Sequence, residues 1–297
     1  MRMNWKSKRL ASMALSKMPH SMSIYDLIQK HITKRYYRDV HQTMSTPNNY
    51  THHLDVFKKY WGDIESAEYF EFGVARDLFS NLLNYCCGMN KQLAIDLNPL
   101  ANSDLVNHTC RQLRDLDYKG IVRRPEQEIS TRFKDDLRKV YGIDYKAPAD
   151  ARNVNLPDGS LDLIATTSTF EHIPEDALRD ILAECYRISH PGTVMSHEVD
   201  YSDHYSHKDM SITPYNFLQF SDEQWDQLYM PHYYQNTLRH NNIREMIVEA
   251  GFKIIEESRV TPENAEEMLQ RVHLAPKFRN YPAADLFAVR GYFVAIK

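Results

Sequence analysis

The chain has 297 residues, 42% of them hydrophobic, which is enough to bury a full core as one large domain or as one domain with additions. Its formal net charge is −4, so no global basic field argues for a nucleic-acid partner. No apolar run reaches the roughly 18 residues of a membrane span, and the N-terminus lacks the apolar region of a signal peptide. The four cysteines show no CxxC pairing, so we expect a cytoplasmic protein with reduced thiols.

The first 62 residues have the pattern of a helical extension. Apolar residues recur at helical spacing from Ile24 to Ile32, a break follows at residues 45–49, and a further helix is predicted from His52 to Trp61. We expect residues 1–62 to form a helical cap that packs on the core or covers a pocket. Residues 63–297 should then form the main domain.

Charge is uneven between these two parts. Residues 1–40 carry nine Lys and Arg against two Asp, a charge of +7, which leaves −11 for residues 41–297. A solvated helix or tail is the simpler interpretation of the basic arm. Contact with a membrane surface or a polyanion is the alternative.

The main domain is organised around residues 68–99. They begin with an apolar strand that closes on Glu71 and Gly73, and Asp77 can cap the helix that follows. A second strand ends just before Asp96. This is the layout of a nucleotide-binding β-α-β unit, in which a glycine lets the backbone approach the ligand and an acid takes the two ribose hydroxyls.

The glycine turn departs from a dinucleotide fingerprint. G-x-G-x-x-G is absent, because Ala75 and Asp77 stand where further glycines would lie. A pyrophosphate would bind poorly at this turn, since the carboxylates of Glu71 and Asp77 would repel it. A cationic, phosphate-free nucleoside would be tolerated.

Strands and helices alternate through the middle of the chain. The patterns predict helices at 103–116, from Pro125 to Gly142 and from Pro174 to His190-Pro191-Gly192, with strands at 143–147, 161–166 and 193–199. Such alternation implies a mainly parallel sheet covered on both faces, and ligands of such sheets bind at the carboxyl ends of the strands. The residues predicted at those ends are Gly73, Asp96, Asp150, Thr167 and Asp200.

These motifs resemble a known family. The segments EFGVARD, AIDLNP, ADARNVNLPDGSLDLIATTSTFEHIP and ECYRISHPGTVMSHEVD follow one another as in class I S-adenosylmethionine-dependent methyltransferases of type 11. The resemblance covers roughly residues 66–260, and DHYSHKD and YYQNTLR are similar to a subgroup associated with glycan or small-molecule pathways. It implies an α/β, Rossmann-like fold with a seven-stranded, mostly parallel sheet, helices on both faces and an antiparallel last strand. Residues 252–260 and 286–296 are the candidates for the last strands.

The resemblance implies S-adenosylmethionine as the cofactor. In the family, the first-strand acid and the glycine loop hold the methionine part, and acids after the second and third strands hold the ribose and the adenine amino group. The matching positions in this chain are Glu71, Gly73 and Ala75 for the methionine part, Asp96 and Leu97 for the ribose and adenine, Asp150 and Ala151 for the adenine amino group, and Thr167 near the sulfonium.

A first loop on the acceptor side covers residues 167–172. His172 is a candidate general base, and Glu171 is a candidate acceptor contact. A divalent-metal site that includes Glu171 and His172 is the alternative. No acid occupies position 167 or 168 to complete a carboxylate-rich cluster, so no metal is assigned.

A second loop follows the fifth strand, within an acceptor-loop insertion expected at about residues 200–240. Residues 197–209 hold three His and four acids, which suit either a polar acceptor loop or a metal site. Strand alternation sends neighbouring side chains to opposite faces, so not all of them converge. The candidates are the bases His204 and His207 and the acceptor contacts Asp200 and Tyr205.

A third segment, residues 231–240, combines aromatic rings with amide and guanidinium donors. Such mixtures suit polyhydroxyl ligands, so Tyr234, Gln235 and Arg239 are candidate acceptor contacts. A helix start packed under the preceding loop is the alternative.

The prediction is methyl transfer from S-adenosylmethionine to an oxygen or nitrogen of a small polar acceptor, with a sugar or glycan precursor as one such acceptor. In-line transfer from a sulfonium needs the acceptor and the methyl to be held together rather than a protein nucleophile. The sequence indeed shows no GxSxG, Walker loop or HExxH. The alternative is a catalytically inactive methyltransferase fold that acts as a binding or scaffold protein. An NAD-dependent dehydrogenase is disfavoured, because the glycines that it needs are missing.

Overall fold

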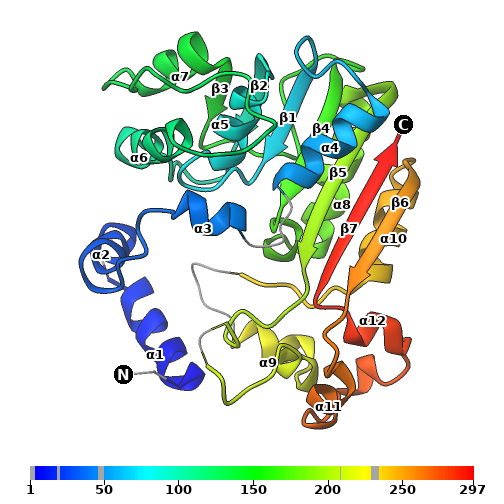
Figure 1. The fold of residues 1–297 in the computed structure, drawn as a ribbon. Helices are drawn as coiled ribbons and strands as arrows, with labels where there is room; N and C mark the ends of the chain where they lie inside the picture. The colour runs from blue at the N-terminus through cyan, green and yellow to red at the C-terminus, as the bar shows by residue number, and fades with distance from the viewer. Residues whose placement is uncertain (1–3, 19–20, 46–49, 208, 229–233) are drawn as a thin grey trace.

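The computed structural model describes residues 4–18, 21–45, 50–207, 209–228 and 234–297. One sheet forms the centre of this part of the chain (Figure 1). Its seven strands are β1 (Glu68–Phe72), β2 (Lys91–Ile95), β3 (Ile143–Lys146), β4 (Leu161–Thr167), β5 (Ser189–Asp200), β6 (Lys253–Val260) and β7 (Arg290–Ile296).

The strand order of the sheet is β3-β2-β1-β4-β5-β7-β6. The strands from β3 to β5 pair in parallel, and β7 runs antiparallel to both β5 and β6. The predicted Rossmann-like sheet with an antiparallel last strand is therefore confirmed.

Helices cover both faces of the sheet, because β1 and its neighbours bury apolar side chains on each side. Tyr69 faces a core shared with one set of helices, and Phe70 and Phe72 face the other core. The first set is α4 (Tyr50–Tyr60), α5 (Phe79–Cys86), α6 (Ser103–Arg114) and α7 (Phe133–Tyr141). The second set is α8 (Glu175–Ile188) and α10 (His240–Glu249).

A third apolar cluster lies beyond the ends of β5 and β6, in the lower part of Figure 1. Its centre includes the buried rings of Tyr215, Phe217 and Trp225. The elements around it are η3 (Asn216–Gln219), α9 (Asp222–Asp226), α11 (Ala265–Gln270), η4 (Pro276–Phe278) and α12 (Ala283–Phe287).

The N-terminal elements connect this third cluster to the sheet domain (Figure 1). The ring of Trp5 lies 5.4 Å from the ring of Tyr205 in the third cluster, while Gln112 of α6 accepts from the backbone N–H of Val40. The elements are α1 (Trp5–Ser16), α2 (Ser21–Leu27), the π-helix η1 (Ile28–Ile32) and α3 (Val40–Ser45). The division into residues 1–62 and 63–297 stays a prediction, and residues 46–49 of the expected break lie outside the described residues.

Three local predictions need correction. Asp77 does not cap α5: within the described residues the N-cap is Leu78 without a side-chain bond, and Asp77 instead accepts from Arg38. The helix expected from Pro125 begins only at Phe133, since the preceding segment is held by loop contacts such as the 2.7 Å bond from the N–H of Ile129 to Asn107 Oδ1. The helix expected to end at residues 190–192 ends at Ile188, because those residues already belong to β5.

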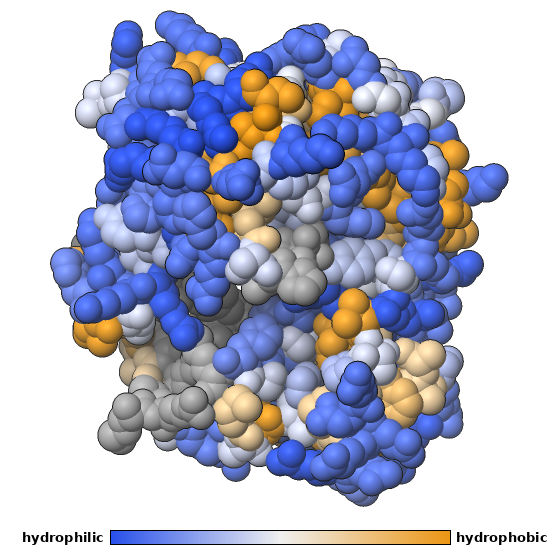
Figure 2. All heavy atoms as spheres, in the orientation of Figure 1, coloured by the Kyte–Doolittle hydropathy of each residue, from blue (hydrophilic) through white to orange (hydrophobic). Residues whose placement is uncertain are grey.

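Among the helices of the described ranges, none combines the length and the apolar character that a membrane span requires. Figure 2 shows hydrophilic side chains over most of the face drawn there. The cytoplasmic location stays a prediction.

Candidate cofactor and acceptor site

The carboxyl ends of the parallel strands point toward the N-terminal helices and the third cluster (Figure 1). β1 ends in a tight turn at Gly73, which is exposed and has φ of +70°. A Cβ at this position would collide with the side chain of Thr169. Glycine is therefore required twice, for its positive φ and for its close approach to the loop after β4.

The backbone of the next motif position keeps the geometry of a glycine. Ala75 is exposed and adopts φ of +61°, a left-handed conformation that costs an alanine about 1 kcal/mol. The turn that a glycine would favour is thus retained despite the missing glycine.

Asp96 follows β2 beside this turn. Its Oδ1 accepts the N–H of Asn98 at 2.9 Å, and its backbone carbonyl accepts the N–H of Ala149 at 2.9 Å. Partial burial raises the pKa of Asp96. The carboxylate is therefore fixed at the strand end by backbone N–H groups of its own loop and of the glycine turn at Ala75.

The other predicted cofactor positions differ in exposure. Asp150 is half-buried and pairs with Arg152 at 2.6 Å, which lowers the pKa of Asp150. Leu97 is 66% exposed and Ala151 is buried. An adenine lying against Leu97 would cover one of the large exposed apolar side chains of this edge.

Glu71 is buried beneath the turn and is not exposed to a ligand there. It is 3% exposed, its carboxylate accepts the hydroxyl of Tyr69 at 2.9 Å, and burial raises its pKa to about 7. We expect Glu71 to support the turn from beneath.

Two N-terminal side chains reach this edge, and the sequence patterns did not single them out. Arg38 donates to Asp77 at 2.6 Å, and His53 lies between Ser196 Oγ at 2.6 Å and Thr167 Oγ1 at 3.1 Å. Both contacts join residues that are far apart in the sequence, so local sequence patterns do not predict them. Burial lowers the pKa of His53 to about 3, so the ring is neutral.

The basic arm uses part of its charge within the fold. Lys30 pairs with Asp104 at 3.1 Å, Asp26 pairs with Arg76 of the glycine turn, and Arg38 pairs with Asp77. Contact of this arm with a membrane or polyanion stays a prediction, and these intramolecular pairs lend it no support.

The loops after β4 and β5 meet on the acceptor side. Glu171 and His172 lie on η2 (Phe170–His172), and one ligand-type atom from each lies within 4.8 Å of one from His204. A second group of this kind combines Asp200, His204 and His207. The predicted acceptor loops therefore converge, and His204 belongs to both groups.

The hydrogen bonds of this cluster fix several of its rings. His172 Nδ1 lies 2.7 Å from the carbonyl oxygen of Tyr234, so Nδ1–H donates and Nε2 keeps its lone pair. Ser202 Oγ donates to Asp200 Oδ1 at 2.6 Å and lies 2.8 Å from His207 Nε2. His207 therefore donates from Nε2 to Ser202.

Glu171 is the most buried acid of the cluster. It is 2% exposed, and burial together with the nearby charge of Asp200 raises its pKa well above the usual range. The backbone N–H groups of Glu171 and Asp200 lie near this carboxylate, but neither of its oxygens accepts a well-formed hydrogen bond from the residues that the structure describes.

Three predicted acceptor contacts have other partners. Gln235 joins its own segment to the loop after β5, because its Nε2–H donates to the carbonyl oxygen of Ser202 at 2.7 Å. Tyr205 is buried and donates to the carbonyl of Leu228. Arg239 is fully buried, and its guanidinium donates to backbone carbonyls of Tyr201, Asp285, Leu286 and Ala288.

These contacts give Arg239, Gln235 and Tyr205 structural roles, and the expectation that they touch the acceptor gains no support from them. Tyr234 is half-buried beside His172. Residues 231–233 of the same expected segment lie outside the described residues.

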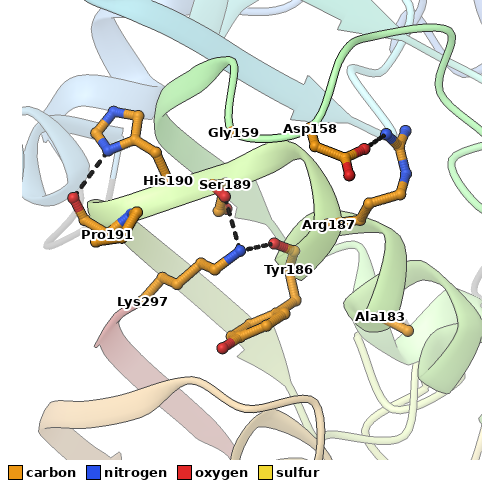
Figure 3. A pocket seen from close by; sticks show the side chains of 9 residues that line it. All are labelled: Asp158, Gly159, Ala183, Tyr186, Arg187, Ser189, His190, Pro191 and Lys297. Carbon is orange, nitrogen blue, oxygen red and sulfur yellow. Dashed lines mark hydrogen bonds and ion pairs between the residues drawn. The ribbon is translucent and has the colours of Figure 1, made fainter.

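A cavity of about 500 Å³ opens at the opposite, amino edge of the sheet (Figure 3). Arg187 on its wall pairs with Asp158, and Lys297 donates to the carbonyls of Tyr186 and Ser189. These polar groups satisfy one another, so this cavity lacks the converging unpaired groups of a reactive site.

Comparison with known families matches residues 124–196 to a family described as a methyltransferase domain. The matched segment includes β3, β4 and most of β5, and it confirms the resemblance to class I methyltransferases. This match supports methyl transfer in general. No curated protein matched the chain.

Many solved structures are similar in fold, and three illustrate the range. An S-adenosylmethionine-dependent methyltransferase from Methanosarcina mazei is 12% identical, with 82% of this chain and 96% of that chain covered and a TM-score of 0.45. The [4+2]-cyclase SpnF is 14% identical, with 84% and 81% covered and a TM-score of 0.49.

The third is phosphoethanolamine N-methyltransferase 2 from Haemonchus contortus, solved with S-adenosylmethionine. It is 15% identical, with 84% of this chain and 53% of that chain covered and a TM-score of 0.47. The chain thus spans about half of that protein. Identities this low leave the reaction and the acceptor open.

Proposed function

We propose that this protein transfers a methyl group from S-adenosylmethionine to an oxygen or nitrogen of a small polar acceptor. The observation that carries the proposal is the layout of one sheet edge. An exposed turn at Gly73 and Ala75 lies beside Asp96, and a cluster of three histidines and two acids follows at the ends of β4 and β5. The family match to residues 124–196 supports the same reaction class.

The residues of the turn fit a nucleoside without phosphates. Asp96 and Asp150 offer carboxylates to the hydroxyls of a ribose and to an amino group, and Leu97 offers an exposed apolar surface to a base. When bound, S-adenosylmethionine supplies an electrophilic methyl group on a cationic sulfur. The acids of this edge favour such a cation, whereas they would repel a pyrophosphate.

Positioning can supply most of the rate enhancement of such a transfer. Holding an acceptor atom in line with the methyl saves the entropy of bringing the two together. An acceptor hydroxyl also has to lose a proton, and the imidazole of His172, His204 or His207 is a candidate base for it. We expect a general base to contribute roughly 10²–10⁴-fold.

The acceptor is proposed as a small polar molecule because the cluster offers imidazole and carboxylate groups rather than a wide apolar surface. A sugar or glycan precursor is one class with suitable hydroxyls. Of the three contacts expected for such an acceptor in residues 231–240, only Tyr234 stays a candidate, since Gln235 and Arg239 have structural partners.

Calorimetric titration of the purified protein with S-adenosylmethionine and with S-adenosylhomocysteine tests the proposal. We expect micromolar binding of both, and we expect Asp96→Ala to weaken it by roughly 100-fold through the loss of two charge-assisted hydrogen bonds. Asp117→Ala, which removes an exposed acid elsewhere, is the matched control and should bind normally.

Circular dichroism has to show that Asp96→Ala stays folded. Normal binding by a folded Asp96→Ala would overturn the placement of the ribose. No binding of either compound by the wild type at millimolar concentration would favour the inactive binding or scaffold protein, with Ala75 as the first suspect.

A further inference from the structure

Glu171 is an acid buried without an ordinary partner. It is 2% exposed, and within the described residues its two carboxylate oxygens accept no hydrogen bond. A buried carboxyl group in that condition costs a few kcal/mol unless a cation or a donor satisfies it. The imidazoles of His172 and His204 each place a ring nitrogen within 4.8 Å of this carboxylate, and imidazoles are metal ligands as readily as they are bases.

We propose that Glu171, His172 and His204 bind one divalent transition-metal ion. One ligand-type atom of each residue lies within 4.8 Å of the others. Two ligands placed about 2.1 Å from a tetrahedral ion lie about 3.4 Å apart, and two ligands on opposite sides lie about 4.2 Å apart. The three side chains can therefore reach one ion with small rotations of their terminal bonds.

The rings are oriented for this role. His172 donates Nδ1–H to the carbonyl oxygen of Tyr234 at 2.7 Å, which leaves the Nε2 lone pair to the ion. A bond from the other ring nitrogen to a carbonyl is the usual support of a metal-bound histidine. The backbone N–H of His204 donates to Gln235 Oε1 at 3.2 Å, and its ring meets the ring of His172 edge-on at 5.0 Å.

Asp200 adds a second carboxylate next to the same ring. Its Oδ2 lies 3.7 Å from His204 Nε2, which exceeds a hydrogen-bond distance and is close to the separation of two ligands on one ion. A cation here would also neutralise the repulsion between Glu171 and Asp200.

The outer group around His207 is a weaker metal site. His207 is exposed, and its Nε2–H is directed to Ser202 Oγ, which itself donates to Asp200. Nε2 of His207 thus carries a proton in a hydrogen-bonded chain and offers no lone pair to a metal ion.

Two imidazoles and a carboxylate select a transition metal such as Zn²⁺, Co²⁺, Fe²⁺ or Mn²⁺ over Mg²⁺ or Ca²⁺. Three protein ligands leave coordination positions open, as in catalytic sites. A role of those positions in holding an acceptor oxygen rests on the proposed function, whereas binding of the ion does not.

The test is titration of chelator-treated full-length protein with Co²⁺, followed by calorimetry and by visible absorption, which reports the ligand set. We expect one Co²⁺ per chain. Glu171→Gln and His204→Ala should each weaken binding by roughly 100-fold or more, since even outer-shell changes cost 10- to 100-fold. His273→Ala removes an exposed histidine elsewhere and should bind as the wild type does.

Glu171→Gln keeps the shape of the side chain. If circular dichroism shows that this variant is folded, a loss of Co²⁺ binding cannot be ascribed to misfolding of the loop. Equal Co²⁺ affinity of the wild type and folded Glu171→Gln would overturn the proposal. Loss of binding in His207→Ala together with full binding in Glu171→Gln would also overturn it, in favour of the outer group. Titration of the same samples with S-adenosylmethionine separates the two proposals, because cobalt binding without cofactor binding refutes only the proposed function.

Discussion

The two edges of the sheet use charged side chains in opposite ways. At the amino edge, Arg187 holds Glu184 and Asp158, and His190 is paired with Asp162 at 2.8 Å. At the carboxyl edge, Glu171 is buried without a well-formed hydrogen bond from the described residues, close to the rings of His172 and His204.

This difference in the pairing of polar groups indicates which edge of the sheet is suited to binding and reaction. The amino edge contains a cavity of about 500 Å³, yet its polar groups are mutually satisfied. Paired groups stabilise a fold, whereas unpaired groups that converge retain the capacity to bind or react. A cavity by itself therefore does not identify the reactive edge.

The sharpest contrast between the edges is in turnover. His204→Ala should lower the methyl-transfer rate by roughly 10²–10⁴-fold, because His204 belongs to both histidine groups of the carboxyl edge. Cofactor affinity should stay within a factor of about two to three. The assay is single-turnover methyl transfer to an acceptor found by screening, with binding measured by calorimetry.

His190→Ala is the matched variant at the amino edge and should leave turnover unchanged. Equal losses in both variants would show that the two edges do not differ in the way proposed.

Stability should respond to the amino edge. Arg187→Ala removes the guanidinium that donates to the 9%-exposed Glu184 and to the carbonyls of Val154 and Leu156, and it should destabilise the protein measurably. Arg179→Ala on the same helix loses only exposed pairs with Glu175 and Glu249, so it should cost less than about 0.5 kcal/mol. Urea unfolding at pH 7.5 measures both, and similar costs would contradict the contrast.

The pH dependence of stability should separate the histidines of the two edges. Burial lowers the pKa of His53 to about 3. Below pH 6.5, His53 therefore binds a proton in the unfolded state but not in the folded state. Stability therefore falls as pH falls, by about 1.4 kcal/mol for His53 between pH 7.5 and 5.5. His53→Asn should remove that loss from the difference between urea-unfolding free energies at the two pH values.

His190 acts in the opposite sense. Asp162 raises the pKa of His190, so the folded state gains the proton more readily and its stabilisation is lost as pH rises through the folded pKa. His190→Asn should make the decline toward low pH steeper. The raised pKa of Glu71 stabilises the folded state at low pH and so opposes the effect of His53. The test is therefore the difference in pH dependence between wild type and variant, not the pH dependence of the wild type alone. An unchanged slope in His53→Asn would contradict the buried neutral ring.

The smallest effect is expected at the glycine turn. Ala75→Gly should stabilise the protein by up to about 1 kcal/mol, because relief of the left-handed strain exceeds the added entropy of the unfolded chain. Ala183→Gly at an exposed position in the interior of α8 should destabilise by about 1 kcal/mol. Thermal unfolding of both variants tests the difference in sign, and a loss of stability in Ala75→Gly would show that the turn is not strained.

The sequence by itself determined the order of strands and helices, the turn at Gly73 and the acids at Asp96 and Asp150. These features depend on local patterns: apolar runs, caps, and residues that directly follow a strand. The Rossmann-like sheet followed from the alternation of those elements and from the family resemblance. The exceptions, such as the late start of α7, arose where long-range side-chain contacts replaced a local helix signal.

Only the tertiary structure decided which candidate side chains meet. Glu171 and His204 are separated by 33 positions, and their convergence depends on how the loops after β4 and β5 pack against each other. The same packing buried Arg239 among backbone carbonyls and brought His53 to Thr167. Sequence periodicity reports the face of each element, but the partner across a loop is fixed by the packing of the whole core, which no local spacing records.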